Sequence, residues 1–287
     1  MTASNRLLVF AFTDPVCTWC WGSEPILRKL QVCYGERLEI SYVMGGLVAD
    51  IRAFYDPAND IGGDPERSNE QVARHWLEAS QRHGMPVRTE GFRLFSQQAV
   101  STFPQNIAVK AAELSSPELA SMFLRRLREA SAAQARETGR QEVLLEIAEE
   151  VGVDVESFRR HLDDGSANEA FQADRELAQQ YGVRGFPSFV LRYQGREMLL
   201  QGYQRYSAFE RKIGELTGGT LSGEVPAATP QNILKFLRQY GRAAPVEIET
   251  VFELSPAECE EVIDELSAQG QVRRISAGNG VLVEGKL

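Results

Sequence analysis

Residues 7–22 read LLVFAFTDPVCTWCWG, and this stretch carries the strongest fold signal of the chain. Its first seven residues form a near-continuous apolar run of strand length, the pattern of a central strand buried on both faces. Asp14 and Pro15 end the run, and from Ile26 to Tyr34 apolar residues recur at spacings of three and four before Gly35. That spacing predicts a helix with a glycine stop. Two cysteines, Cys17 and Cys20, therefore lie where a strand passes into a helix.

The sequence further along predicts a second strand, a long helical block and a returning hairpin. Leu38, Ile40 and Tyr42 alternate with polar neighbours and predict a strand, and Gly45 to Pro65 has the composition of a loop. Helices are then expected at 69–82, 104–114, 142–151, 155–162 and 168–181, with one more opening at a capping box of Ser115 and Glu118. Strands are expected again at 188–193 and 197–201, followed by a helix at 207–216.

A separate C-terminal region is predicted beyond residue 217. Residues 217–229, TGGTLSGEVPAAT, have the composition of a linker. Helices are expected at 231–240 and 246–252, and a third opens with the capping box Ser255-Pro256-Ala257-Glu258. A hairpin around Gly278-Asn279-Gly280 ends the chain, so three helices and a wing favour a winged-helix-like module that the linker separates from the rest.

The composition excludes several classes of protein. The 287 residues are 43% hydrophobic and 25% charged, as in an ordinary globular chain. A net charge of -9 disfavours DNA and RNA as partners. No apolar run approaches the roughly 20 residues of a membrane span, and the start at Met1 lacks the pattern of an export signal, so a cytoplasmic protein is expected. Four cysteines are too few for a disulfide framework.

The spacing of Cys17 and Cys20 points to redox chemistry. A helix N-terminus favours a thiolate, which is expected to lower the pKa of Cys17, and a thiol one turn further on can resolve a mixed disulfide. The alternatives are half of a zinc site or two inert thiols, although zinc needs four ligands and the sequence offers no second CxxC or HxxxH pair. Cys33 and Cys259 fall on apolar helical faces and are expected to be structural. No link to the motif is expected for the three histidines, His75, His83 and His161.

A second motif precedes the returning strand. Residues 183–188, VRGFPS, place an X-Pro bond where a cis peptide is a common feature of folds. Over residues 6–217, the strand, CxxC helix and strand, the helical block and the Gly-Phe-Pro hairpin resemble the DsbA family of thioredoxin-fold oxidoreductases. The run DPVCTWCWG is similar to the active-site segment of the cytosolic branch of that family.

The resemblance implies an α/β architecture, a thioredoxin fold with a large helical insertion, and roles for four residues. It implies Cys17 as the nucleophile, Cys20 as the resolving thiol, and Phe186-Pro187 as a cis turn against the sulfurs whose backbone pairs with bound peptide. The thioredoxin-like domain would comprise residues 1–60, with the CxxC, and 183–217, with the cis-Pro hairpin. The helical insertion would be 61–182, the linker 218–229 and the winged-helix-like domain 230–287.

Aromatic and acidic residues around the motif are further candidates. Trp19, Trp21 and Phe186 are candidates for an apolar rim that binds peptide, with core packing as the alternative for Trp21. Asp14 and Glu24 flank the motif, and either carboxylate is a candidate to move protons for the resolving thiol, the alternative being a solvated or capping acid. The dipeptide between the cysteines lacks the histidine of the exported relatives, which predicts a less oxidising disulfide.

The leading hypothesis is a cytosolic thiol-disulfide oxidoreductase that acts on protein or peptide disulfides without a metal or organic cofactor. Glutathione and a thioredoxin-type reductant are candidate partners, and the direction of electron flow stays open. No nucleic acid partner is expected, since residues 255–268 carry Glu and Asp but no Lys or Arg. No membrane partner is expected, since no apolar run is long enough to span a bilayer. The C-terminal module is expected to dock proteins or to form a homodimer.

Two other hypotheses stay open. One is an adaptor that hands a client protein to a protease, because some cytosolic DsbA-like proteins with an extra C-terminal domain resemble this architecture. The other is a glutathione-dependent isomerase or transferase of the same superfold, against which the intact CxxC argues.

Overall fold

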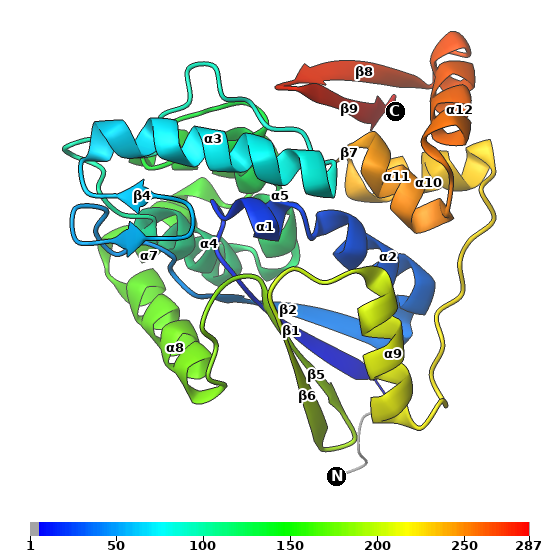
Figure 1. Cartoon of the computed structure of the whole chain (residues 1–287), viewed down its shortest axis with the longest axis horizontal. Helices are drawn as coiled ribbons and strands as arrows, with labels where there is room; N and C mark the ends of the chain where they lie inside the picture. Colours follow the sequence, from blue (N-terminus) through cyan, green and yellow to red (C-terminus); the bar gives the residue numbers. More distant parts are fainter. Residues whose placement is uncertain (1–5, 287) are drawn as a thin grey trace.

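A four-stranded sheet lies at the centre of the computed structural model, which describes residues 6–286 (Figure 1). Its order is β2-β1-β5-β6, formed by β1 (Leu7–Thr13), β2 (Leu38–Met44), β5 (Ser188–Tyr193) and β6 (Arg196–Gln201). β1 pairs in parallel with β2 and antiparallel with β5. The predicted strands and the returning hairpin are confirmed.

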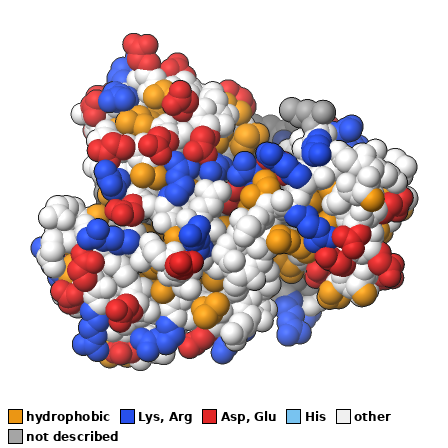
Figure 2. Space-filling view, turned by 90° about the horizontal axis from the view of Figure 1, so that it is seen from above, with side chains coloured by type: hydrophobic (Ala, Val, Ile, Leu, Met, Phe, Trp, Pro, Cys, Tyr) orange, Lys and Arg blue, Asp and Glu red, His pale blue; other side chains and the backbone are white. Residues whose placement is uncertain are grey.

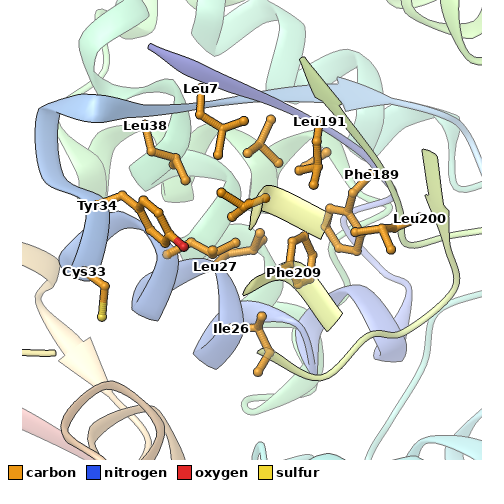
Figure 3. Close-up of a cluster of buried hydrophobic side chains, with 14 of the residues drawn as sticks. Leu7, Ile26, Leu27, Cys33, Tyr34, Leu38, Phe189, Leu191, Leu200 and Phe209 are labelled. Carbon is orange, nitrogen blue, oxygen red and sulfur yellow. The ribbon is translucent and has the colours of Figure 1, made fainter. Parts of the chain in front are cut away.

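Helices cover both faces of this sheet. On one face α2 (Glu24–Tyr34), closed by the short turn η1 (Gly35–Arg37), packs beside α9 (Tyr206–Thr217). Leu7 and Leu191 of the strands meet Leu27 and Phe209 of these helices in the core shown in Figure 3. Since successive side chains of a strand point to opposite faces, Phe12 of β1 packs on the other side, beneath α8 (Ser166–Gln180).

The insertion between the two halves of the sheet is mainly helical. Besides α8 it contains α3 (Pro65–His83), α4 (Phe103–Ser115), η2 (Pro117–Leu119), α5 (Ala120–Ala132), α6 (Gln141–Val151) and α7 (Val155–Asp163). The expected loop from Gly45 to Pro65 also holds a small hairpin, β3 (Tyr55–Asp56) and β4 (Ile61–Gly62). The predicted capping box of Ser115 and Glu118 is wrong, because Ser115 is the last residue of α4 and Glu118 lies in η2.

The C-terminal region contains three helices and a three-stranded sheet of order β7-β9-β8. Its elements are α10 (Pro230–Tyr240), β7 (Arg242–Ala243), α11 (Pro245–Phe252), α12 (Pro256–Ala268), β8 (Val272–Ala277) and β9 (Gly280–Gly285). The predicted capping box of Ser255 and Glu258 is present at the start of α12. The winged-helix interpretation of this region stays a prediction.

The C-terminal region packs directly on the rest of the molecule. α11 lies against α2, and the tip of the β8–β9 hairpin docks on the insertion, where the side chain of Asn279 accepts a hydrogen bond of 2.8 Å from the backbone N–H of Val87. Residues 218–229 form no helix or strand and run beside α2, where the N–H of Glu224 donates to the carbonyl of Cys33 at 2.8 Å. The expectation that the linker separates this region from the core is therefore wrong.

Between residues 6 and 286, no helix is both long and apolar enough to span a membrane.

Candidate active site

The motif cysteines lie on a helix of a single turn, α1 (Thr18–Trp21). Cys17 is its N-cap and Cys20 lies inside it, and both are buried free thiols that lie close together. α1 ends at Gly22, where a Cβ atom would lie 2.5 Å from the ring of His83. Glycine is needed at this position because α1 approaches α3 so closely.

The Gly-Phe-Pro motif meets the CxxC motif at the sulfur of Cys17. The Phe186–Pro187 peptide bond is cis, and Sγ of Cys17 lies 3.6 Å from the carbonyl oxygen of Phe186, to which it donates. The Phe186 ring covers Gly45, where a Cβ atom would lie 1.9 Å from the ring. The fold thus brings the two motifs into one site. The roles of Cys17, Cys20 and Pro187 in catalysis stay predictions.

The two thiols have opposite environments. The hydrogen bond with Cys20 and burial raise the pKa of Cys17 well above its usual range, and its thiol donates to a carbonyl, which favours the protonated form. At Cys20 burial also acts to raise the pKa, but the hydrogen bond from Cys17, the charge of Arg128 and the hydroxyl of Thr13 outweigh it and lower the pKa. The charge of Arg128 thus favours one thiolate within the hydrogen-bonded Cys17–Cys20 pair, and the lowered pKa expected for Cys17 stays a prediction.

Arg128 of α5 supplies that cation. Its buried guanidinium donates to Oε1 of Glu24 and to Oγ1 of Thr13. Glu24 also faces Arg125 at 3.6 Å and Arg28 at 3.9 Å. Burial acts to raise the pKa of Glu24, but the three arginines hold it below its usual range. This carboxylate is therefore ionised and paired with the arginines, and proton transfer by Glu24 stays a prediction.

Asp14 is the buried acid on the Cys17 side of the site. Its carboxylate accepts hydrogen bonds from the backbone N–H groups of Val16 at 2.9 Å and Leu47 at 2.7 Å, and from the side chain of Asn106 at 2.8 Å. Burial raises the pKa of Asp14, although these hydrogen bonds act to lower it. Proton transfer by Asp14 stays a prediction.

The two tryptophans of the motif occupy different environments. Trp19 is half-buried, and its ring contacts His75, His83 and Tyr203 at centroid distances of 6.2, 5.9 and 5.5 Å. Trp21 is fully buried and donates from Nε1 to the carbonyl of Pro86 at 2.9 Å. The structure therefore excludes Trp21 from a substrate-binding rim, and the alternative of core packing is correct.

His83 lies beside the motif, although the sequence showed no such link. Its Nδ1 accepts a hydrogen bond from the N–H of Met85 at 3.1 Å, so the proton of the neutral ring is on Nε2, which lies 3.3 Å from Oγ1 of Thr18. Burial and the charge of His75 lower the pKa of His83 to about 4. His83 stands 65 residues from Thr18 in the chain, so only the packing of α1 against α3 could reveal the contact.

A pocket of about 240 Å³ adjoins Cys17. Trp19 and Phe186 line it together with apolar side chains from the segment after β2 and from the insertion, among them Val48, Phe54, Ile61, Trp76, Leu94 and Phe95. Asp56, Asn59 and His75 add polar groups. Mainly apolar pockets with few polar groups are the usual binding sites of small ligands and anchoring side chains. The pocket residues from the segment after β2 and from the insertion could not be predicted, because their spacing in the sequence indicates only loop and core.

A model of the thioredoxin family matches residues 10–211. The chain belongs to this family. Membership confirms the predicted thioredoxin fold and the resemblance seen in the two motifs. The match to the thioredoxin family ends before the C-terminal region begins.

Relatives named ClpXP adapter protein SpxH extend over nearly the whole chain. The protein of Halalkalibacterium halodurans is 27% identical over 266 residues, which cover 91% of this chain and 82% of the relative. That of Bacillus subtilis is 26% identical over 278 residues, covering 96% and 88%. Among solved structures, the cytosolic disulfide reductase DsbM of Pseudomonas aeruginosa is 25% identical with a TM-score of 0.55, covering 74% of this chain and 94% of that one.

Proposed function

We propose that the protein is a cytoplasmic thiol-disulfide oxidoreductase that acts on peptide or protein disulfides through Cys17 and Cys20. The contact of 3.6 Å between Sγ of Cys17 and the carbonyl of Phe186 carries the proposal, because a peptide paired with the backbone of Phe186 would lie beside the sulfur that we propose as the nucleophile. The similarity to a disulfide reductase supports the reaction class.

The chemistry proceeds in two exchanges. The Cys17 thiolate attacks one sulfur of the substrate disulfide, a mixed disulfide forms, and the leaving thiolate takes up a proton. The Cys20 thiolate then attacks the Cys17 sulfur, which forms the Cys17–Cys20 disulfide and releases the second substrate thiol. Two electrons pass from the dithiol to the substrate, and two molecules of an external thiol such as glutathione return them and are oxidised to a disulfide. In the first exchange Cys17 passes its proton to the hydrogen-bonded sulfur of Cys20, and the leaving thiolate then takes that proton, so that Cys20 is a thiolate again when it attacks Cys17.

The surroundings of Cys17 favour an apolar residue near the reactive disulfide. The pocket walls are mainly apolar, and Trp19 and Phe186 stand at the side of the nucleophile. On the face that Figure 2 shows, Lys and Arg side chains are intermixed with Asp and Glu. In α12 and the hairpin that follows it, Arg274 pairs with Glu260 at 2.8 Å and Asp264 at 2.7 Å. These features support a protein partner over a nucleic acid.

The test is the glutathione-dependent reduction of a model protein disulfide. We expect turnover by the wild type and none by a Cys17→Ser, Cys20→Ser double variant. Cys33→Ala is the matched control, because Cys33 is equally buried but lies outside the motif. Equal turnover by the double variant and the wild type would overturn the proposal.

An adaptor is the second candidate function. The observation that favours it is that relatives named ClpXP adapter match 91% and 96% of this chain and therefore extend into the C-terminal region. An adaptor binds its client through surface contacts and does not require the dithiol. Capture of client proteins from cell extract separates the two candidates. The adaptor is favoured if the double variant still binds the client proteins and the wild type shows no turnover.

A further inference from the structure

Residues 84–88 follow α3 and form no helix or strand. We call them the 84–88 loop. Met85, Pro86 and Val87 of this loop are buried, and their backbone groups therefore need hydrogen-bond partners within the protein. Partners lie on two sides of the loop, in the C-terminal region and in the CxxC helix α1.

The tip of the β8–β9 hairpin holds one side of the 84–88 loop, beside the C-terminal end of α3 (Figure 1). The side chain of Asn279 accepts from the N–H of Val87 at 2.8 Å and donates to Oγ of Ser80 at 3.1 Å. The N–H of Asn279 donates to the carbonyl of Val87 at 2.9 Å. At Gly278 a Cβ atom would lie 2.1 Å from the Val87 carbonyl oxygen, so the close approach of the two backbones requires glycine there. The hairpin tip therefore fits closely on the loop.

The other side of the 84–88 loop holds α1. Nε1 of Trp21 donates to the carbonyl of Pro86 at 2.9 Å, and the N–H of Met85 donates to Nδ1 of His83 at 3.1 Å. The second hydrogen bond leaves the proton of the neutral ring on Nε2, which donates to Oγ1 of Thr18 across 3.3 Å. Since Thr18 and Trp21 are the first and last residues of α1, the loop and His83 hold both ends of the CxxC helix.

The contacts on both sides of the 84–88 loop are largely shielded from water. Four of the residues that make them are at most 5% exposed, namely Thr18, Trp21, Ser80 and His83. Removing one partner of a buried hydrogen bond leaves the other unsatisfied, which costs more than the loss of an exposed hydrogen bond. Cys17 is the N-cap of α1, so a shift of this helix would change both the access of reagents to its sulfur and the contact of that sulfur with Phe186.

We propose that Asn279 of the C-terminal region is a positioning residue for Cys17. Asn279 fixes the 84–88 loop, and the loop fixes the CxxC helix through His83 and Trp21. The hairpin tip thereby limits the access of reagents to Cys17 and keeps its sulfur beside the carbonyl of Phe186. This inference rests on the proposed function where it concerns disulfide exchange, whereas the reactivity of the thiol can be measured without it.

A double-mutant cycle between the hairpin tip and α1 tests the proposal in the reduced full-length protein. Asn279→Ala removes the side chain that holds the loop, and Thr18→Val removes the hydroxyl that His83 contacts but keeps the branched shape. Each variant is expected to raise the rate at which iodoacetamide alkylates Cys17, located by mass spectrometry, by about three- to tenfold, the effect of one net hydrogen bond. Because both substitutions act through the same loop, the rate of the double variant is expected to stay well below the product of the two single effects.

Three controls separate positioning from a general loss of stability. Thr18→Ser keeps the hydroxyl and is expected to react at close to the wild-type rate. Arg274→Gln, in the same hairpin, removes the ion pairs with Glu260 and Asp264 and is expected to leave the rate unchanged. Ile213→Val removes a methyl group from the core beneath α9, and it is expected to lower the midpoint of urea unfolding without raising the alkylation rate.

The coupling between the two substitutions decides the proposal. If their effects multiply in the double variant, the hairpin tip does not act on α1 and the proposal is overturned. An unchanged alkylation rate in Asn279→Ala would overturn it as well, and so would an equal rise in Ile213→Val. Alkylation needs no turnover, so coupled effects in a protein without exchange activity would overturn the proposed function and leave this inference standing.

Discussion

At the scale of single residues, the division of labour between the two thiols follows from what each one touches. Cys17 faces the Phe186 carbonyl and the pocket, whereas Cys20 faces Thr13 and Arg128. Cys17→Ser is expected to abolish exchange, since no other sulfur adjoins the pocket among the described residues. Cys20→Ser is expected to accumulate mixed disulfides, because the resolving thiol is lost. Mass spectrometry after incubation with a disulfide-containing peptide distinguishes the two variants. Equal amounts of mixed disulfide in both would contradict the roles of Cys17 as nucleophile and Cys20 as resolving thiol.

Substitution of Gly45 gives a second prediction at the residue scale. A methyl group there would overlap the Phe186 ring, so Gly45→Ala is expected to displace that ring and its carbonyl from Cys17. We expect a loss of about 1–3 kcal/mol in the free energy of unfolding, together with slower exchange, measured by urea unfolding and by the glutathione assay. Gly214→Ala in α9 is the control, because it lies outside the site and nothing lies within 4 Å of the added carbon. Equal effects of the two variants would show that the fit of Phe186 on Gly45 is unimportant.

The sequence predicts site residues that lie in short motifs, but not those that packing brings together from distant parts of the chain. Cys17, Cys20 and Phe186-Pro187 were predicted, because each lies in a short motif with its own pattern. Arg128 was not predicted, since an arginine within an amphipathic helix has no local mark of burial, and its partner Glu24 lies 104 residues away. Trp21 was ambiguous for the same reason, because a tryptophan next to the motif fits a rim and a core equally well.

At the scale of elements, the strands and most helices were predicted from periodicity, and the errors lie at their ends. α3 begins at Pro65 rather than Asn69, because Asp64 caps it and accepts from the N–H of Arg67. The apolar periodicity has not yet begun in that first turn. Ser115 was predicted as an N-cap because a Pro and a Glu follow it, yet it is the last residue of α4.

The end of α3 makes the stability of the protein depend on pH. The pKa of His83 is about 4 in the folded protein and 6.5 in an exposed histidine, so the unfolded chain binds more protons between these values. Stability is therefore expected to fall by up to about 3 kcal/mol as the pH drops from 6.5 to 4 and to level off below that range. His83→Gln is expected to flatten this part of the pH profile in urea unfolding. The same slope in both proteins would show that His83 binds protons alike in the folded and unfolded chains.

At the scale of the whole molecule, the composition of residues 218–229 predicted a separate C-terminal region, whereas that region packs on α2 and on the insertion. Composition identifies residues 218–229 as loop, but it contains no information on where the following helices pack. The residues that join the C-terminal region to the rest of the molecule lie in no recognisable sequence motif. Ala244, Ala277 and Leu282 join Trp21 and Trp76 in one hydrophobic cluster, and Arg242 pairs with Glu129 of α5 at 2.9 Å.

Removal of the C-terminal region is therefore expected to damage the redox domain. A chain ending at Gly219 would uncover the cluster around Trp76, Met85 and Val87 and would take Glu247 away from Arg125. Exposing two or more large apolar side chains costs at least about 3 kcal/mol, so the truncated protein is expected to unfold at markedly lower urea concentration than the full chain. Cys17 is expected to react faster with thiol reagents, because α1 loses part of its support. An unchanged unfolding midpoint, with unchanged Cys17 reactivity, would show that the region is an independent module after all.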